Sequence, residues 1–169
     1  MNTKMSVLAF FTALAATPVA LAIDVPQTRQ EFVEAVVAKK AVVETLRAGQ
    51  PLDKVISVLE ERAGACLDVK VERTANVGYV EHSSSTYHPT VRRIDDGRAE
   101  FTLQVEHFPR GVGHTPPPGG LFMLAADLKS VDDGHTEVVL YRPKIGGGKI
   151  AESLKQWLSG DPAPCPKLR

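Results

Sequence analysis

The side chains best suited to metal chemistry are histidines, and they are scattered along the chain. A zinc site usually needs three or four converging ligands, often at helical or short-loop spacing. Only His82 and His88 are close in the sequence, and the chain holds no H-E-x-x-H motif and no Cys/His cluster. The pattern therefore predicts surface or strand-edge histidines, no metal site and no cofactor. The five histidines are His82, His88, His107, His114 and His135.

Nucleophilic catalysis has little support in the order of the residues. The serine run 83–85 follows His82, but no G-x-S-x-G motif places a serine on a sharp strand-to-helix turn. Glu106 and His107 are neighbours on a predicted strand, so their side chains point to opposite faces of the sheet. We assign no catalytic residue. A hydrolase whose site assembles from distant residues stays open, because a fold does not settle a function.

The run Gly146-Gly147-Gly148-Lys149 stands directly before a predicted helix. Free amides and the helix dipole attract anions at such a place, which suggests a phosphate site. The P-loop spacing is absent, because Ile150 follows the lysine where Ser or Thr is required. A flexible strand-to-helix connector is the better interpretation.

The N-terminal stretch has the pattern of a secretory signal peptide. Lys4 supplies the positive region, Val7–Ala16 the apolar core, and residues 20–22 an A-x-A site, so cleavage is expected after Ala22. A membrane anchor is the alternative, but the apolar run is too short to span a bilayer and Pro18 interrupts it. The mature protein is expected to be periplasmic or secreted.

Residues 23–169 have the length of a single domain with its own core. The chain carries 20 basic and 20 acidic residues, interspersed and without a basic cluster. This balance argues against nucleic acid and against an anionic membrane surface as partners. No later stretch is apolar for long enough to span a membrane. We expect a monomer.

Two cysteines, Cys66 and Cys165, remain in the exported chain. A lone pair outside the cytoplasm is most simply a structural disulfide. The alternative, a reactive thiol pair, lacks the C-x-x-C spacing. A disulfide would fasten the proline-rich C-terminal tail beside the first helix–strand junction.

Residues Thr86–Arg142 predict an antiparallel meander of four strands. Two Asp-Asp-Gly runs, residues 95–97 and 132–134, mark its hairpins, because glycine accepts the positive φ that such turns demand. The sheet would have one apolar face, and the helices before and after the meander are expected to cover it. The second strand of the meander alternates polar residues with Phe101, Leu103 and Val105.

Two helices are predicted before the meander. Thr28 and Glu31 fit a capping box at the start of the first helix, and a second helix begins in the turn of Pro51 and ends with Gly64 as its cap. This end would place Cys66 at the head of a strand. The apolar face of the first helix consists of Phe32, Val33, Val36 and Val37.

The segment Ala41–Leu46 suits either a helix or a strand. We favour a strand, because Lys39-Lys40 breaks the apolar face of the preceding helix and β-branched residues follow. Thr74–Ser85 has no regular pattern.

The loop Pro109–Gly120 interrupts the meander. Its three consecutive prolines cannot donate to a sheet ladder, so the connection should be stiff and should protrude. The loop is either a tolerated surface insertion or a functional loop. In the second case Arg110 and His114 would gate a cavity mouth or grip a partner.

A last helix is predicted from about Lys149 to Ser159, and its apolar stripe should cover the sheet. Its Trp157 suits a core anchor better than a ligand platform, although it could also contact a ligand. The stripe consists of Ile150, Leu154, Trp157 and Leu158.

This order of elements over Ala41–Ser159 resembles the helix-grip domains, which include START-like lipid-transfer proteins and small bacterial envelope modules. The resemblance implies an α+β fold. A curved antiparallel sheet of five or six strands would pack on the C-terminal helix, with one or two N-terminal helices. It also implies an apolar interior that sometimes holds a ligand.

The sequence therefore predicts an exported, non-catalytic binding module of the bacterial envelope. A small apolar molecule or lipid would lie between the sheet and the last helix, with the loop 109–120 at the mouth. As an alternative, the same loop would contact another envelope protein. The predicted ligand-binding residues are Phe101, Leu103, Val105, Arg110, His114 and Trp157.

Overall fold

Six strands and three helices make up the computed structural model, which describes residues 25–76, 80–109 and 115–168. The helices are α1 Arg29–Ala38, α2 Leu52–Leu67 and α3 Gly148–Leu158. The strands are β1 Val42–Ala48, β2 Lys70–Asn76, β3 Val80–Asp95, β4 Arg98–Phe108, β5 Leu121–Asp132 and β6 His135–Arg142. The signal-peptide prediction falls on residues outside this description.

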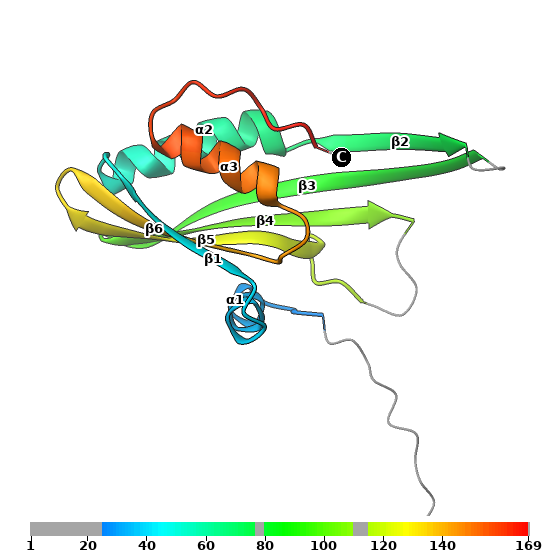
Figure 1. Ribbon diagram of the computed structural model, residues 1–169, viewed down its shortest axis with the longest axis horizontal. Helices are drawn as coiled ribbons and strands as arrows, with labels where there is room; N and C mark the ends of the chain where they lie inside the picture. Colours follow the sequence, from blue (N-terminus) through cyan, green and yellow to red (C-terminus); the bar gives the residue numbers. More distant parts are fainter. Residues whose placement is uncertain (1–24, 77–79, 110–114, 169) are drawn as a thin grey trace, which may run out of the picture.

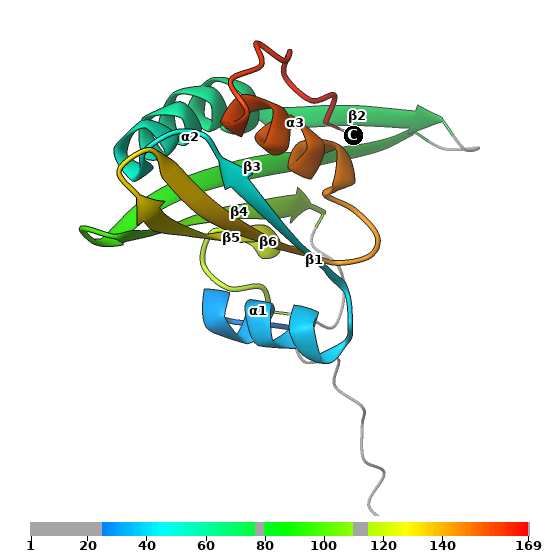
Figure 2. The same ribbon diagram turned by 60° about the vertical axis from the view of Figure 1, so that its left-hand side comes forward.

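All strand pairs are antiparallel, and the sheet order is β1-β6-β5-β4-β3-β2. The sheet is twisted and open, with α2 and α3 on one face and α1 on the other (Figure 1, Figure 2). The predicted α+β class is thus confirmed, with a last helix packed on the sheet as in a helix grip. Among the described residues, no helix is long and apolar enough to cross a membrane.

Both Asp-Asp-Gly hairpins are confirmed, but neither Gly97 nor Gly134 has the positive φ that the prediction expected. The Asp95 carboxylate accepts a hydrogen bond from the Gly97 amide at 2.9 Å, and Asp132 accepts one from the Gly134 amide at 2.9 Å. These side chain-to-backbone bonds stabilise each turn locally. The first turn joins β3 to β4 and the second joins β5 to β6, and β4 pairs with both of its neighbours over its whole apolar run.

The main core lies between the sheet and the helices α2 and α3. The apolar stripe of α3 lies in the same buried cluster as the apolar residues of β4, so the predicted role of this helix as a cover is confirmed. Side chains from α2 fill the rest of this layer. The buried residues that the sequence singled out here are Phe101, Leu103, Val105, Ile150, Leu154, Trp157 and Leu158.

The first helix covers the other face of the sheet, not the main apolar face. Phe32 and Val36 are buried against Ala125 of β5, and the Phe32 and Phe122 rings stack at 5.7 Å. Val37 stays exposed, although the pattern placed it on the buried face. The reason is geometric: α1 rests on a narrow apolar strip of an otherwise polar face, so only part of its stripe is covered.

The second helix is longer than predicted, and two expectations about its end are wrong. It runs to Leu67, so Gly64 is an interior residue and Cys66 lies on the helix, not at the head of a strand. Ala63, Cys66 and Leu67 continue its buried stripe. Burial of this extra turn outweighs the cost of an interior glycine, about 1 kcal/mol.

The structure also differs from the prediction in residues 74–85. The segment that lacked a regular pattern lies largely in the hairpin of β2 and β3, and the serine run 83–85 pairs with residues 71–73 of β2. Serine has no marked strand preference, but β3 is held by neighbours on both sides, and such context overrides local propensity. The ambiguous segment Ala41–Leu46 contributes to β1, as favoured.

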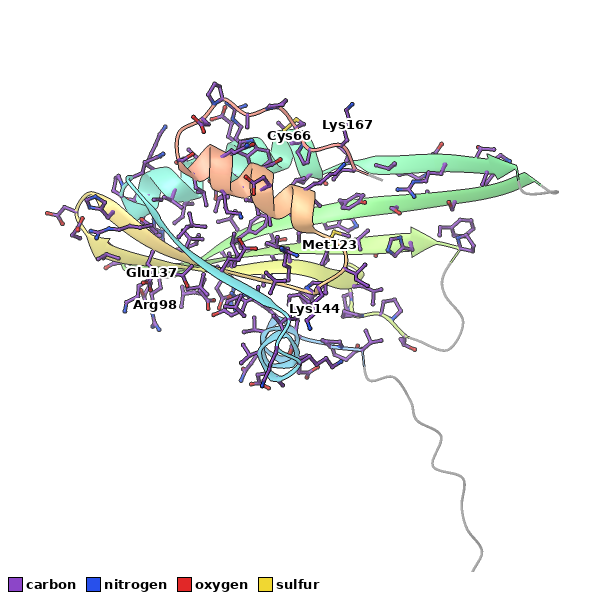
Figure 3. The ribbon with its side chains drawn as sticks, in the orientation of Figure 1. Cys66, Arg98, Met123, Glu137, Lys144 and Lys167 are labelled. Carbon is purple, nitrogen blue, oxygen red and sulfur yellow. A yellow bond between two sulfur atoms is a disulfide. The ribbon has the colours of Figure 1, made fainter. Side chains whose placement is uncertain are left out.

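The predicted disulfide joins Cys66 to Cys165 with their Cα atoms 5.1 Å apart. The tail passes over α3 and returns to α2, where Figure 3 labels Cys66. The Trp157 indole donates a hydrogen bond to the Ala163 carbonyl at 3.2 Å, which holds the tail at a second point.

Candidate functional site

A cavity of about 350 Å³ opens where α3 begins, and we call it the helix-end cavity. It lies between the inner face of the sheet, the first turn of α3 and the C-terminal tail. Figure 3 labels Met123 and Lys167 near the start of α3. Its lining residues are Tyr87, Met123, Gly146, Gly147, Gly148, Lys149, Ile150, Lys167 and Leu168.

The glycines before α3 leave this space unfilled. Gly147 has a left-handed φ of 68°, and a Cβ added there would lie 3.4 Å from the Met123 carbonyl oxygen. A side chain at this position would be strained and would press on β5. The glycine run that sequence reasoning interpreted as a flexible connector thus brings the chain close to the sheet and forms a wall of the cavity.

The cavity has an apolar interior and a cationic rim. Tyr87 and Ile150 are buried, and Met123 and Leu168 pack against the same core. Burial raises the pKa of the Tyr87 hydroxyl, with Arg73 opposing the shift, so the phenol stays neutral at physiological pH. The charged lining residues are Lys149 and Lys167.

Glu44 fixes the position of α3 over the sheet. Its carboxylate accepts hydrogen bonds from Lys155 at 2.7 Å and from Arg142 at 3.1 Å. The hydrogen bond from Lys155 is the main cause that holds the pKa of Glu44 below its ordinary value, although burial works against it. Arg142 also lies under the start of α3, 3.9 Å from where a Gly148 Cβ would be.

A second cavity, of about 750 Å³, lies beside the proline-rich loop, and we call it the proline-loop cavity. Gly120 has a φ of 91°, and a Cβ there would lie 2.2 Å from the Val105 carbonyl oxygen, so only glycine fits. The Gln104 amide donates to the Pro118 and Gly120 carbonyls, both at 2.9 Å. Its lining residues are Gln27, Val105, Glu106, His107, Pro109, Thr115, Pro116, Pro117, Pro118, Gly120 and Leu121.

The structure also brings together two polar residues that sequence reasoning kept apart. Ser85 Oγ and His107 Nδ1 are 2.9 Å apart across β3 and β4, where the two residues are direct partners. Glu106 points to the opposite face, where its carboxylate lies 3.9 Å from His88. The Ser85–His107 pair therefore gains no orienting acid from this neighbour. Knowledge of the strand register would have revealed the pair.

The predicted ligand-binding residues are separated by the fold. Phe101, Leu103 and Trp157 lie in the packed core and line neither of the two cavities, whereas Val105 lines the proline-loop cavity. Arg110 and His114 lie outside the described residues. A role for these residues in ligand binding stays a prediction. Within the described chain, no group of three His, Cys, Asp or Glu side chains could hold a metal ion.

Comparisons with known proteins assign this chain to no family. No protein-family model matches it, and neither does any curated protein. One similar solved structure is the crystal structure of the di-domain ARO/CYC StfQ from the steffimycin biosynthetic pathway. The two share 13% sequence identity with a TM-score of 0.32 over 70% of this chain and 42% of that one.

Proposed function

We propose that this chain is an exported, non-catalytic binding module that holds a small amphiphile in the helix-end cavity. The ligand would have an apolar body and an anionic group. The observation that carries the proposal is the cavity itself, of about 350 Å³ between the sheet, the start of α3 and the tail. This volume falls in the range of small-molecule sites, about 300–1,000 Å³.

The lining of the cavity explains the chemistry of the ligand. Tyr87, Met123 and Leu168 offer apolar contact, which contributes about 25 cal/mol for each Å² removed from water. Lys149 and Lys167 at the rim favour an anionic group. The N-cap residue Gly147 has no side chain to bond the first amides of α3, so these amides add to the attraction.

The same lining supports binding over catalysis. The described lining residues of this cavity include no carboxylate, histidine, serine or cysteine. Lysine and tyrosine also serve in general acid–base and nucleophilic catalysis, but they usually need a neighbouring carboxylate or histidine to activate them, and the described lining supplies neither. A site that offers apolar contact and two lysines is better suited to hold a molecule than to transform it.

A fluorescent fatty acid, dansyl-undecanoic acid, tests the proposal by titration into the purified mature protein. We expect saturable binding to the wild type and at least a ten-fold loss in Leu168→Trp, because the larger ring fills the cavity. Leu121→Trp in the proline-loop cavity is the matched control and should bind as the wild type does. Absence of saturable binding, or an equal loss in both variants, would contradict the proposal.

A protein partner at the proline-loop cavity is the second candidate. Phe108 is 68% exposed and Leu121 36% exposed beside this cavity, so the described loop ends present apolar surface. Extended apolar segments bind in such stiff, preformed grooves at a low entropic cost. Chemical cross-linking in the envelope should then give a partner that Leu121→Asp loses and Leu168→Trp keeps. Retention of the partner by Leu121→Asp would exclude this site.

A further inference from the structure

The loop between β6 and α3 presents an apolar tip next to the helix-end cavity. Ile145 is 91% exposed in this loop, the largest value among the exposed large hydrophobic residues of the described chain. Gly146, its neighbour, lines the cavity. Exposure of a whole isoleucine side chain to water is unfavourable. A complex in which a partner removes Ile145 from water would therefore be stabilised.

Unpaired lysines stand around this tip. Lys144 precedes it in the loop, and Lys149 and Lys167 line the adjoining cavity. In the described part of the chain, the lysine ion pairs belong to Lys70 and Lys155. The three lysines near the loop therefore carry charge that no described carboxylate neutralises.

Acidic residues on the adjoining elements are already engaged. Glu44 of β1 pairs with Arg142 and Lys155, and Glu152 of α3 pairs with Lys155. Residues 142–149 hold three basic residues and no acidic one. The surface around the start of α3 therefore carries an excess of basic residues, although the basic and acidic residues of the whole chain balance.

The lysines and the isoleucine lie around the start of α3. Figure 3 labels Lys144 and Lys167 on either side of Met123, where α3 begins. We call Lys144, Ile145, Lys149 and Lys167 the basic tip.

We propose that the basic tip docks the protein on an anionic lipid bilayer. Ile145 would insert among the headgroups while the lysines contact lipid phosphates. Lysine is a mobile point charge, which suits a diffuse anionic surface. Protein interfaces instead centre on packed patches rich in aromatic residues and arginine. A lone aliphatic side chain among glycines offers no such patch.

Docking in this orientation brings the mouth of the helix-end cavity to the bilayer surface. Uptake of an amphiphile from the bilayer would follow, and this consequence rests on the proposed function. The docking itself goes beyond that function and does not depend on it, because it is measurable with vesicles and no added ligand.

Vesicle sedimentation tests the docking with the mature, disulfide-bonded protein. Vesicles of phosphatidylcholine alone are compared with vesicles of phosphatidylcholine and phosphatidylglycerol at low salt. We expect binding to the anionic vesicles only, and release as salt screens the charges. Each change of Lys144, Lys149 or Lys167 to Gln should weaken binding about five-fold, and Ile145→Ser about ten-fold.

Matched controls come from the start of α2 and the β5–β6 hairpin, which lie away from the start of α3 in Figure 1. Lys54→Gln removes an exposed lysine at the start of α2, and Val131→Ser removes an apolar side chain that is 52% exposed near the second hairpin. Both should bind anionic vesicles as the wild type does.

Three results would overturn the docking proposal. These are no binding to either type of vesicle, equal binding to both types, and equal losses in control and basic-tip variants. Absence of binding to either type of vesicle would favour a protein partner for the exposed tip. Failure of dansyl-undecanoic acid to bind, with vesicle sedimentation intact, would count against the proposed function and leave the docking supported.

Discussion

Glu44 links α3 to the sheet through one carboxylate, and its substitution should lower stability in a pH-dependent way. The hydrogen bond from Lys155 lowers its pKa from the ordinary value of 4.5. We expect Glu44→Gln to lower the free energy of unfolding by about 1 kcal/mol at neutral pH. The check is a thermal unfolding series across pH for both proteins.

The direction of the pH dependence follows from the lowered pKa. As the pH falls below 4.5, the unfolded chain binds a proton at Glu44 before the folded chain does. The stability that Glu44 contributes is therefore complete above this value and is lost as the pH passes through the folded pKa. The difference in the free energy of unfolding between the wild type and Glu44→Gln should therefore shrink as the pH falls. Glu60→Gln, at an exposed position of α2, should show no such pattern.

Arg29 fastens α1 to the sheet. It pairs with Asp127, lies 3.3 Å from Glu100, and donates to the Ala126 carbonyl at 2.8 Å. Tyr141 also donates to Asp127 at 2.8 Å, and burial together with this hydrogen bond raises the pKa of Tyr141 to about 12. Removal of the guanidinium therefore takes a donor from the Ala126 carbonyl, while Asp127 keeps its bond from Tyr141 and Glu100 keeps its bond from Arg92.

Arg29→Met should accordingly lower the free energy of unfolding by about 1–2 kcal/mol. Urea denaturation measures this as a lower midpoint with an unchanged slope. Arg92→Met is the matched control, because Arg92 also bonds Glu100 but is mostly exposed. A similar loss in both variants would show that exposure does not determine the strength of these contacts.

Residue-scale features were predictable where they depend on near neighbours. Thr28 caps α1 as expected and accepts a hydrogen bond from the Glu31 amide at 3.2 Å. The Glu31 carboxylate accepts from the Gln27 amide, one residue before the predicted partner. The Ser85–His107 pair and the Arg29 contacts join residues far apart in the sequence, so they depend on a register that local patterns do not specify.

At the scale of elements, the length of α2 leads to a prediction about Gly64. As a helix cap in a left-handed conformation, glycine would resist replacement. Inside the helix, and with no atom within 4 Å of an added Cβ, it should accept alanine. We expect Gly64→Ala to raise the free energy of unfolding by about 0.5–1 kcal/mol.

The control for this prediction is Gly147→Ala before α3. Gly147 has a φ of 68° and lies close to the Met123 carbonyl, so alanine should destabilise the protein. Chemical denaturation of the two variants gives shifts of opposite sign if α2 continues through Gly64. A loss of stability in Gly64→Ala would mean that the helix ends there.

The disulfide holds the tail as a wall of the helix-end cavity. Cys165 joins the tail to α2, and Leu168 packs on the core only three residues later. Replacement of both cysteines by serine should lower the free energy of unfolding by about 2–5 kcal/mol. The same change should weaken dansyl-undecanoic acid binding, because Lys167 and Leu168 are no longer held at the cavity.

Denaturation followed by the fluorescence of Trp157 measures the first effect, and titration of the probe measures the second. Leu168→Ala provides a comparison, because it removes a lining side chain and keeps the disulfide. Unchanged probe binding in the double serine variant would show that the tail is no part of the site.

The helices and strands were predictable from the sequence where their pattern is strong. The Asp-Gly hairpins and the stripe of α3 were predictable because a turn and a helical face are local signals. The side of the sheet that α1 covers was not predictable, because the apolar pattern of a short amphipathic helix does not specify which face of a sheet the helix covers. The helix-end cavity was also hidden, because it forms where three segments distant in the sequence meet.

At the scale of the whole molecule, net charge does not describe where the charges lie. Equal numbers of acidic and basic residues argued against an anionic surface as partner. The fold instead gathers Lys149 and Lys167 at one cavity, and it pairs Glu44 and Glu152 with other cations. The net charge of the whole chain is an average, whereas a partner contacts only one part of the surface.

Export is the last prediction, and two features support it. Residues 1–22 carry the pattern of a cleaved signal, and the bond between Cys66 and Cys165 forms in oxidising compartments. Expression of the full chain in a bacterium with a periplasm should give a periplasmic product that starts at Ile23, measured by intact mass after osmotic shock. Its mass should also lack the two hydrogens that the disulfide removes.

Replacement of the small residue at the cleavage site distinguishes transport across the membrane from cleavage of the signal peptide. Ala22→Arg should block cleavage and leave a larger, membrane-retained precursor, whereas Ala41→Ser, in the mature chain, should be processed normally. The disulfide should form in both, because the mature part crosses the membrane in each case. Recovery of uncleaved wild-type protein in the cytoplasm with reduced thiols would contradict the export prediction, and with it the envelope location of the proposed binding function.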